Sequence, residues 1–158
     1  MKKYIDPKKL EDGKVLVYLK HKYVEESTEE NIYPLLGCLR DSQVLVPMNV
    51  TMSEEDEAMF KNADVGDVVQ SKGDIRLIPD ILQNDDKYYF PMFSNKEQMP
   101  EDYANHFSII DLSVVQCIEM AKNIDKLSGL VIDAFTEPMV IKFDLADVIM
   151  KLESSCKE

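Results

Sequence analysis

The densest apolar pattern in the chain lies in residues 87–93 and is typical of a strand. Both faces of that strand are apolar: Tyr88, Phe90 and Met92 on one, and Tyr89, Pro91 and Phe93 on the other. This alternation predicts an inner strand that is covered on both sides. Pro91 cannot donate a ladder hydrogen bond, so we expect a bulge or an unpaired segment beside it. Core burial is the ordinary role of such aromatic residues. A partner-contacting surface at Tyr88 and Tyr89 is the alternative.

Helix starts are indicated at three places in the second half of the chain. Ser94 supplies an N-cap oxygen, and Glu97 stands three residues later, at the spacing of a capping box. Ser113 and Asp144 stand in the same position before two apolar helical stripes. The stripes are Val114, Cys117, Ile118, Ala121 and Ile124 after Ser113, and Leu145, Val148, Ile149 and Leu152 after Asp144.

Two helices are predicted near the N-terminus. From Pro7 to about Tyr23 apolar residues recur loosely at helical spacing, although residues 15–19 also suit a strand by propensity. The second helix has apolar residues at i, i+3, i+4 and i+7: Ile32, Leu35, Leu36 and Leu39. With Asn31 as its N-cap, Pro34 falls in the first turn, where the missing N–H has no intrahelical partner to lose.

The remaining pattern predicts strands and hairpins. Residues 43–48 form a strand that ends or kinks at Pro47, and the acidic residues 53–57 suit the first turn of a helix. One hairpin joins residues 75–82 to residues 87–93 through a four-residue loop.

The later strands complete the fold. Residues 106–112 form the next strand, and a second hairpin joins residues 129–133 to residues 139–143. This order predicts a single α+β domain over residues 1–152: two N-terminal helices, then a mixed β-sheet of about five or six strands packed with helices. Residues 153–158 are expected to fray as a tail.

Composition is that of one soluble globular domain, with 158 residues, 45% hydrophobic and 30% charged. No apolar run approaches the roughly 20 residues of a membrane span, and charged residues follow the Met1-Lys2-Lys3 start where a signal peptide would be apolar. We therefore expect a cytoplasmic protein without membrane contact.

The charge is unevenly distributed. Residues 1–22 contain seven lysines and three acidic residues, a local sum of +4, within a chain whose net charge is −12. The remaining 136 residues therefore carry 11 basic and 27 acidic groups, or −16. An acidic field repels phosphate backbones, so we expect no nucleic-acid partner. Solubility alone accounts for the acidity.

Candidate chemistry is sparse. Three cysteines, Cys38, Cys117 and Cys156, are an odd number without CxxC spacing and predict neither a disulfide framework nor a zinc site. The acidic run 53–57 lacks the alternating carboxylates and central glycine of a calcium loop. A pair of Cys117 with His106 is conceivable, but the apolar stripe around that thiol would raise its pKa.

Catalytic sequence signatures are also missing. The chain has no G-x-S-x-G elbow, glycine-rich phosphate loop or HExxH helix. We expect no catalytic activity, no cofactor and no bound metal.

Four stretches resemble the N-terminal domain of the SseB family (enhanced serine sensitivity proteins). Residues 28–47 are similar to the family's helix followed by a Leu-Val-Pro strand, and residues 143–149 close the domain in the same way. Residues 90–97 are similar to the signature Pro-Val-Phe-Thr-Ser-x-Glu, with Ser94-Asn95 in place of Thr-Ser. Residues 129–133 stand where members have Gly-Leu-Val-Ile-Asn-Pro, with Asp133-Ala134 in place of Asn-Pro. The resemblance covers roughly residues 8–152. It implies an α/β fold and a loose connection to serine sensitivity, and it supplies no catalytic residues.

Two functions remain open. We prefer a non-enzymatic protein-interaction or regulatory module with an unknown protein partner, or one that self-associates as a homodimer through the basic arm or an edge strand. The alternative is a pocket near the sheet that binds or converts a small, amino-acid-like metabolite. Charged residues inside apolar strands sometimes mark such sites. The candidate residues for a binding surface are Arg76, Asp80, Tyr88, Tyr89 and Asp133.

Overall fold

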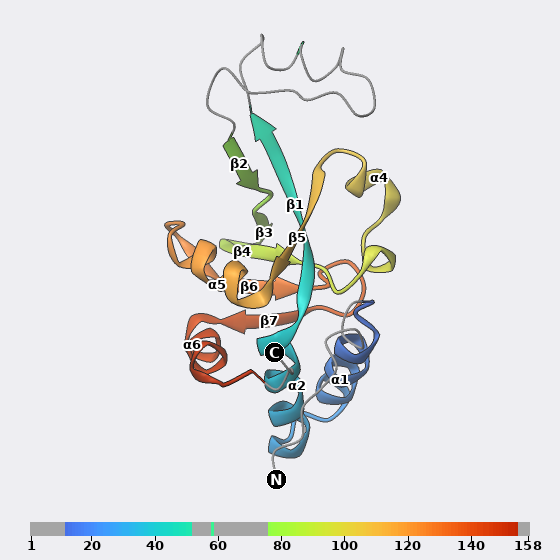
Figure 1. Ribbon diagram of the computed structural model, residues 1–158, viewed down its shortest axis with the longest axis vertical. Coiled ribbons are helices and arrows are strands. Elements are labelled where there is room, and N and C mark those ends of the chain that lie inside the picture. The colour runs from blue at the N-terminus through green and yellow to red at the C-terminus, as the bar shows by residue number, and fades with distance from the viewer. Residues whose placement is uncertain (1–11, 52–57, 59–75, 155–158) are drawn as a thin grey trace.

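The computed structural model describes residues 12–51, 58 and 76–154 (Figure 1). Its helices and strands follow one another in this order: α1 (Lys14–Glu25), α2 (Glu29–Asp41), β1 (Gln43–Thr51), β2 (Arg76–Pro79), β3 (Leu82–Asn84), β4 (Lys87–Met92), a 3₁₀ turn (Lys96–Gln98), α4 (Glu101–Ala104), β5 (Ser108–Ser113), α5 (Val114–Lys122), β6 (Leu127–Ile132), β7 (Met139–Lys142) and α6 (Phe143–Lys151). The predicted α+β domain with two helices before its strands is confirmed. The acidic run 53–57 lies outside the described residues.

The described strands form two sheets instead of the single sheet that the pattern predicts. One is antiparallel with the order β2-β1-β5, and the other is mixed with the order β3-β4-β6-β7, in which β4 and β6 are parallel. Leu45 of β1 and Phe93, directly after β4, exchange two backbone hydrogen bonds of 2.8 and 2.9 Å. These bonds join the two sheets. One edge of β1 pairs with β5; on the other edge, Leu45 pairs with Phe93 and residues 48–51 pair with β2.

The division follows from a break inside residues 75–82. Pro79 ends β2 and has no N–H with which to extend the ladder. The next residue, Asp80, donates its N–H to the Pro47 carbonyl at 3.0 Å, and the chain then crosses to the other sheet as β3. The predicted first hairpin is therefore limited to β3 and β4, whereas the predicted second hairpin is confirmed as the antiparallel pair β6 and β7.

The core lies between the mixed sheet and the helices. On this side α5 packs against β4 and β6, α6 packs against β6 and β7, and α2 packs against both helices (Figure 1). The strands contribute side chains that are completely buried: Phe90, Met92, Leu130, Ile132 and Ile141. Each such side chain gains roughly 1.5–3 kcal/mol from leaving water, before entropy is counted. The first face of the aromatic strand is therefore covered, as expected.

The second face of that strand is covered only in part. Pro91 and Phe93 are buried, but Tyr89 is half-buried. Tyr88, at the start of the first face, is 38% exposed. The expected irregularity is present, since the register of β4 against β6 shifts between Tyr88 and Tyr89.

Of the four predicted N-caps, Ser113 is confirmed, and Asn31 and Asp144 are among those that are wrong. Ser113 caps α5 in a capping box with Gln116. The cap of α2 is Thr28, one turn before the predicted Asn31, so Pro34 lies beyond the first turn. The predicted cap at Asp144 is wrong because α6 begins at Phe143, and the Asp144 carboxylate accepts only the neighbouring Leu145 N–H, at 2.8 Å.

The end of the described chain is held at α2. The Arg40 guanidinium donates to the Leu152 carbonyl at 2.9 Å, and the Ser154 hydroxyl donates to Asp41 at 2.5 Å. Within the ranges described, no helix is both long enough and apolar enough to cross a membrane.

Candidate functional site

The β6–β7 loop (residues 133–138) separates two regions of opposite character. On one side lies a polar cluster, which we define as Lys20, Ser94, Asp133 and Glu137. On the other side lies a concavity on the outer face of the mixed sheet, which we call the sheet groove.

Ser94 and Asp133 meet because β4 and β6 are parallel neighbours and each residue closely follows the carboxyl end of its strand. One Asp133 oxygen, Oδ1, accepts the Ser94 N–H at 2.8 Å, and the other, Oδ2, accepts the Ser94 hydroxyl at 2.7 Å. The Asp133 N–H donates to the Met92 carbonyl at 2.9 Å. The predicted N-cap role of Ser94 is therefore wrong, since its hydroxyl is taken by Asp133, and only a 3₁₀ turn follows.

Lys20 enters the polar cluster from α1 and is 1% exposed. Its Nζ lies 3.2 Å from Asp133 Oδ2, donates to the Glu137 carbonyl, and lies 3.9 Å from Glu137 Oε1. Asp133 is fully buried, so each charge neutralises a partner that would be very unfavourable alone in the interior. The pair thus fixes α1 to the ends of β4 and β6.

Gly13 brings the start of α1 equally close. Its φ of 71° is in the left-handed region, and a Cβ placed on it would lie 2.2 Å from the Ser94 carbonyl oxygen. Only glycine meets both conditions. The backbone of α1 therefore rests directly on the chain at Ser94.

His21 forms the solvent-exposed end of this region. Its Nδ1 lies 2.9 Å from Glu137 Oε2, and its Nε2 lies 3.7 Å from Glu25 Oε1. The hydrogen bond to Glu137 and the charge of that carboxylate raise the pKa of His21 above its ordinary value of 6.5.

The polar cluster is built as an internal clamp. Both Asp133 oxygens accept hydrogen bonds inside the protein, and the Ser94 hydroxyl donates to a carboxylate that is itself paired with Lys20.

Burial raises the pKa of the Cys117 thiol to about 12, as the apolar stripe predicts, so thiolate is scarce at neutral pH. Within the described ranges no three His, Cys, Asp or Glu side chains are grouped to hold a metal ion.

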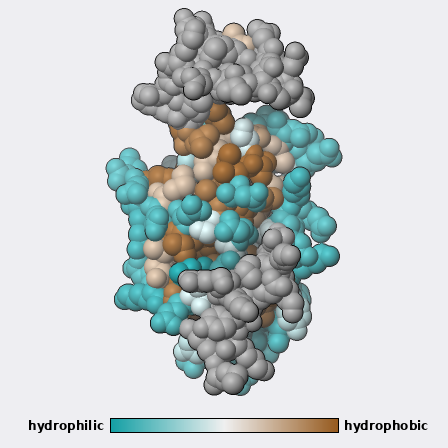
Figure 2. All heavy atoms as spheres, in the orientation of Figure 1, coloured by the Kyte–Doolittle hydropathy of each residue, from teal (hydrophilic) through white to brown (hydrophobic). Residues whose placement is uncertain are grey.

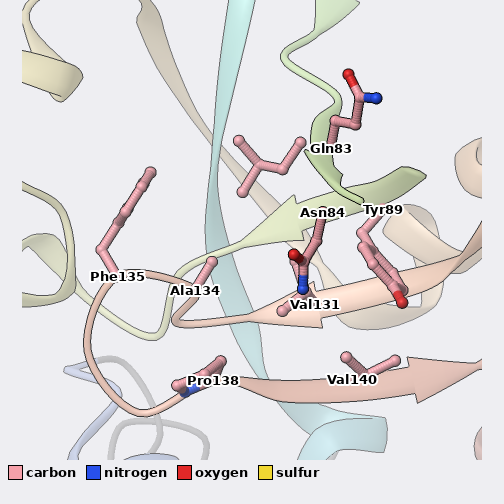
Figure 3. Close-up of a pocket in the computed structure, with 9 residues that line it drawn as sticks. Gln83, Asn84, Tyr89, Val131, Ala134, Phe135, Pro138 and Val140 are labelled. Atoms are coloured by element: carbon pink, nitrogen blue, oxygen red, sulfur yellow. The ribbon is translucent and has the colours of Figure 1, made fainter. Parts of the chain in front are cut away.

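The sheet groove has a volume of about 380 Å³. It is lined by Leu82, Gln83, Asn84, Tyr89, Val131, Ala134, Phe135, Pro138 and Val140. Figure 3 shows Tyr89, Val131 and Val140 projecting from three neighbouring strands, with Phe135 and Pro138 on the loop at one end. Strand alternation explains this placement, because these strand residues are the neighbours of Phe90, Leu130 and Ile141 and point away from the core.

Phe135 forms a preformed wall of the groove. Its ring is stacked on the buried Phe93 at 5.9 Å with an interplanar angle of 8°, and lies 4.8 Å from the Tyr103 ring. The ring is nevertheless 47% exposed, and Val140 across the groove is 41% exposed. Packed aromatic neighbours hold the exposed ring in place, so the groove needs little reorganisation to receive a ligand.

The structure does not bring the five predicted site residues together. Tyr89 lines the sheet groove, Tyr88 points to the other side of the strand, and Asp133 is enclosed in the polar cluster. The Asp80 carboxylate accepts the Tyr103 hydroxyl at 2.6 Å; burial, and then this bond, raises the pKa of that phenol. Arg76 pairs with Thr51 in β2, and its side chain is not among those described.

Sequence reasoning missed both the clamp and most of the groove. Lys20 stands four residues after the buried Leu16, so its place on the inner face of α1 was a detectable signal. Val140 alternates with the core residues Met139 and Ile141, which was the corresponding signal for the groove.

Comparison with known proteins identifies the family and nothing finer. The family model for the SseB protein N-terminal domain matches residues 19–144, which is most of the chain. No curated protein and no solved structure matches. The match includes all four residues of the polar cluster and all residues of the sheet groove. The chain belongs to the SseB N-terminal domain family.

Proposed function

We propose that this domain is a non-enzymatic interaction module that binds an apolar segment of another protein in the sheet groove, in the cytoplasm and without a nucleic-acid partner. The observation that carries the proposal is the groove itself: a preformed concavity of about 380 Å³ with a mainly apolar lining, of which Phe135, Pro138 and Val140 are exposed. Its volume lies at the lower end of ordinary ligand sites and suits one or two inserted side chains. Exposed aromatic and aliphatic residues in a preformed pocket are typical binding anchors.

The polar cluster supports a role in binding over one in catalysis. A general base or nucleophile needs access to its substrate. Lys20 and Asp133 are buried and paired with each other; Lys20 also donates to the Glu137 carbonyl, and Asp133 accepts the Ser94 hydroxyl. Their arrangement suits a structural clamp, and none of the described residues that line the groove on the other side of the loop carries a charge for acid–base catalysis.

A second apolar area lies over the ends of β1 and β2 (Figure 2). Val50, Leu77 and Ile78 are exposed there. These strands lead directly into residues 52–57 and 59–75, which lie outside the described residues. The groove, whose surrounding chain is described, therefore carries the proposal.

Selection of peptides from a random displayed library tests the proposal even though the partner is unidentified. Peptides enriched on the wild-type domain should lose binding to Val140→Glu, because the carboxylate would occupy an apolar site. Val148→Glu is the matched control: Val148 is 45% exposed on α6, close to the 41% of Val140, and is not a groove residue. Enriched peptides that bind both variants equally would place binding elsewhere, and failure to enrich any peptide would contradict the proposal.

Two other occupants are outcomes of further measurements. Asn84 and Tyr89 add polar groups to an apolar lining, which also suits a small metabolite. A ligand that stabilises the wild type but not Val140→Glu in a thermal screen of amino acids and nucleotides would identify that case. A dimer in light scattering that becomes a monomer in Val140→Glu would identify a second copy of the chain as the occupant.

A further inference from the structure

Two lysines share the face of the mixed sheet that forms the groove. Lys87 stands two residues before Tyr89 in β4, and Lys142 stands two residues after Val140 in β7. Because side chains alternate along a strand, both lysines project from the same face as these two groove residues. Both are exposed.

The register puts the two lysines at one end of the groove. Lys142 pairs with Gly129 of β6, which in turn pairs with Tyr89, while Lys87 pairs with Asn84 of β3. One strand lies between β4 and β7, so their backbones are roughly 10 Å apart. Gly129 supplies a floor without a side chain, since a Cβ there would lie 2.5 Å from the Ile141 carbonyl oxygen. The two lysines therefore stand on either side of the same end of the sheet groove.

The charge at this end is not neutralised by the described residues of the face. Neither lysine has an ion-pair partner in the described part of the chain, and the groove lining contains no charged residue. The acidic residues nearest to the two lysines along the chain lie outside the strands of this face: Asp85 and Asp86 belong to the β3–β4 turn, and Asp144 belongs to the first turn of α6, where its carboxylate accepts the Leu145 N–H. The overall charge of −12 acts over longer distances, where salt screens it beyond about 8 Å.

We propose that the segment bound in the sheet groove is acidic: one or two apolar side chains enter the groove, and an adjacent Asp or Glu carboxylate binds the ammonium groups of Lys87 and Lys142. This inference rests on the proposed function and adds the chemistry of the partner. An apolar anchor followed by a carboxylate matches the order of surfaces on the face, and the paired lysines reject a basic segment by like-charge repulsion.

The peptides selected on the wild-type domain provide the first readout. Those that lose binding to Val140→Glu should carry Asp or Glu beside their apolar residues. The second readout is the affinity of one such synthetic peptide for Lys87→Gln/Lys142→Gln, measured by fluorescence anisotropy. Exposed charge pairs are individually weak, so we expect about a tenfold loss at low salt for the acidic peptide. We expect no loss for the same peptide with Asn or Gln in place of its acids.

A matched variant controls for total charge. Lys96→Gln/Lys151→Gln removes two exposed lysines that lie in the 3₁₀ turn and in α6, away from the groove face. It should bind the acidic peptide like the wild type, and increasing salt should weaken wild-type binding but not that of the groove-lysine variant.

The outcomes separate the two proposals. Groove-dependent peptides that are basic or uncharged, or that bind Lys87→Gln/Lys142→Gln normally, would overturn the inference and leave the proposed function standing. Peptides indifferent to Val140→Glu would overturn both.

Discussion

The polar cluster and the sheet groove are built on the same loop and have opposite chemistry. Asp133 and Glu137 turn from the β6–β7 loop toward α1, where Lys20 and His21 contact them. Ala134, Phe135 and Pro138 of the same loop line the groove. The central ion pair of the charged side, Lys20 with Asp133, is buried and internally satisfied, whereas the apolar side has exposed side chains at Phe135 and Val140. In this domain the residues that look reactive hold the fold, and the residues that look inert form the accessible surface.

The largest expected effect follows from removing the buried ammonium group. Lys20→Met leaves the Asp133 carboxylate buried without its counter-charge, and such losses destabilise proteins by about 3–5 kcal/mol. Urea denaturation measures the free energy of unfolding. Lys22→Met, at an exposed position of the same helix, is the control; it removes only the contact of Lys22 Nζ with the Tyr18 ring, 5.6 Å away, and should cost at most about 1 kcal/mol. Equal, small effects would show that the clamp contributes nothing.

Removing both charges together should cost much less than removing either one. Asp133 has a left-handed φ of 55°, which Asn also adopts readily, so Asp133→Asn removes the charge without adding backbone strain. In Lys20→Met/Asp133→Asn no buried charge is left unpaired, and we expect about 2 kcal/mol or more of the Lys20→Met loss to be recovered. A double mutant whose loss equals the sum of the two single losses would contradict the clamp.

Substitution of two glycines by alanine should change the stability by smaller amounts and in opposite directions: Gly13 precedes α1, and Gly37 lies within α2. Gly13→Ala forces a Cβ against the Ser94 carbonyl at a left-handed φ, and should destabilise by about 1–3 kcal/mol. Gly37→Ala meets no atom within 4 Å in α2 and should stabilise by about 0.5–1 kcal/mol. Thermal unfolding of the two variants distinguishes them, and a neutral Gly13→Ala would mean that α1 does not rest on Ser94.

The smallest effect concerns pH at the exposed edge of the clamp. The pKa of His21 is raised in the folded state by its hydrogen bond to Glu137, so protonated His21 stabilises the fold. That contribution is complete below the ordinary pKa of 6.5 and is lost as the pH rises through the raised value. The free energy of unfolding of the wild type, measured from pH 5.5 to 8.5, should therefore decline as the pH rises. This decline should be absent in His21→Gln. A parallel decline in both would assign it to other groups.

Local patterns predicted the local structure well. The Ser113 cap and its stripe depend on residues within one helix, and the β6–β7 hairpin depends on neighbours in sequence. The α5 helix and this hairpin could therefore be predicted from the sequence. The fold class and the family followed from the order of such elements and from the signature around Phe93.

Contacts between residues far apart in sequence determine the features that local patterns predicted wrongly. The spacing of Ser94 and Glu97 matches a capping box, but Asp133, 39 residues away, accepts the Ser94 hydroxyl. Residues 75–82 match a single strand in sequence, yet residues 76–79 pair with β1 in one sheet and Leu82 begins β3, which pairs with β4 in the other. Asp133 is predictable as a charged residue at the end of a strand, which alone suggests a binding site; its partner Lys20 lies in α1, far away in sequence, so the clamp is not predictable from local patterns.

The proposed function requires that a partner binds on the outer face of the mixed sheet. Backbone amide NMR of the domain, titrated with a peptide selected on it, tests this residue by residue. We predict that the largest shifts occur at Tyr89, Val131, Phe135 and Val140, with Lys20 and Leu16 of α1 unchanged. Shifts centred instead on Val50, Leu77 and Ile78 of the other sheet, with the groove unperturbed, would contradict it.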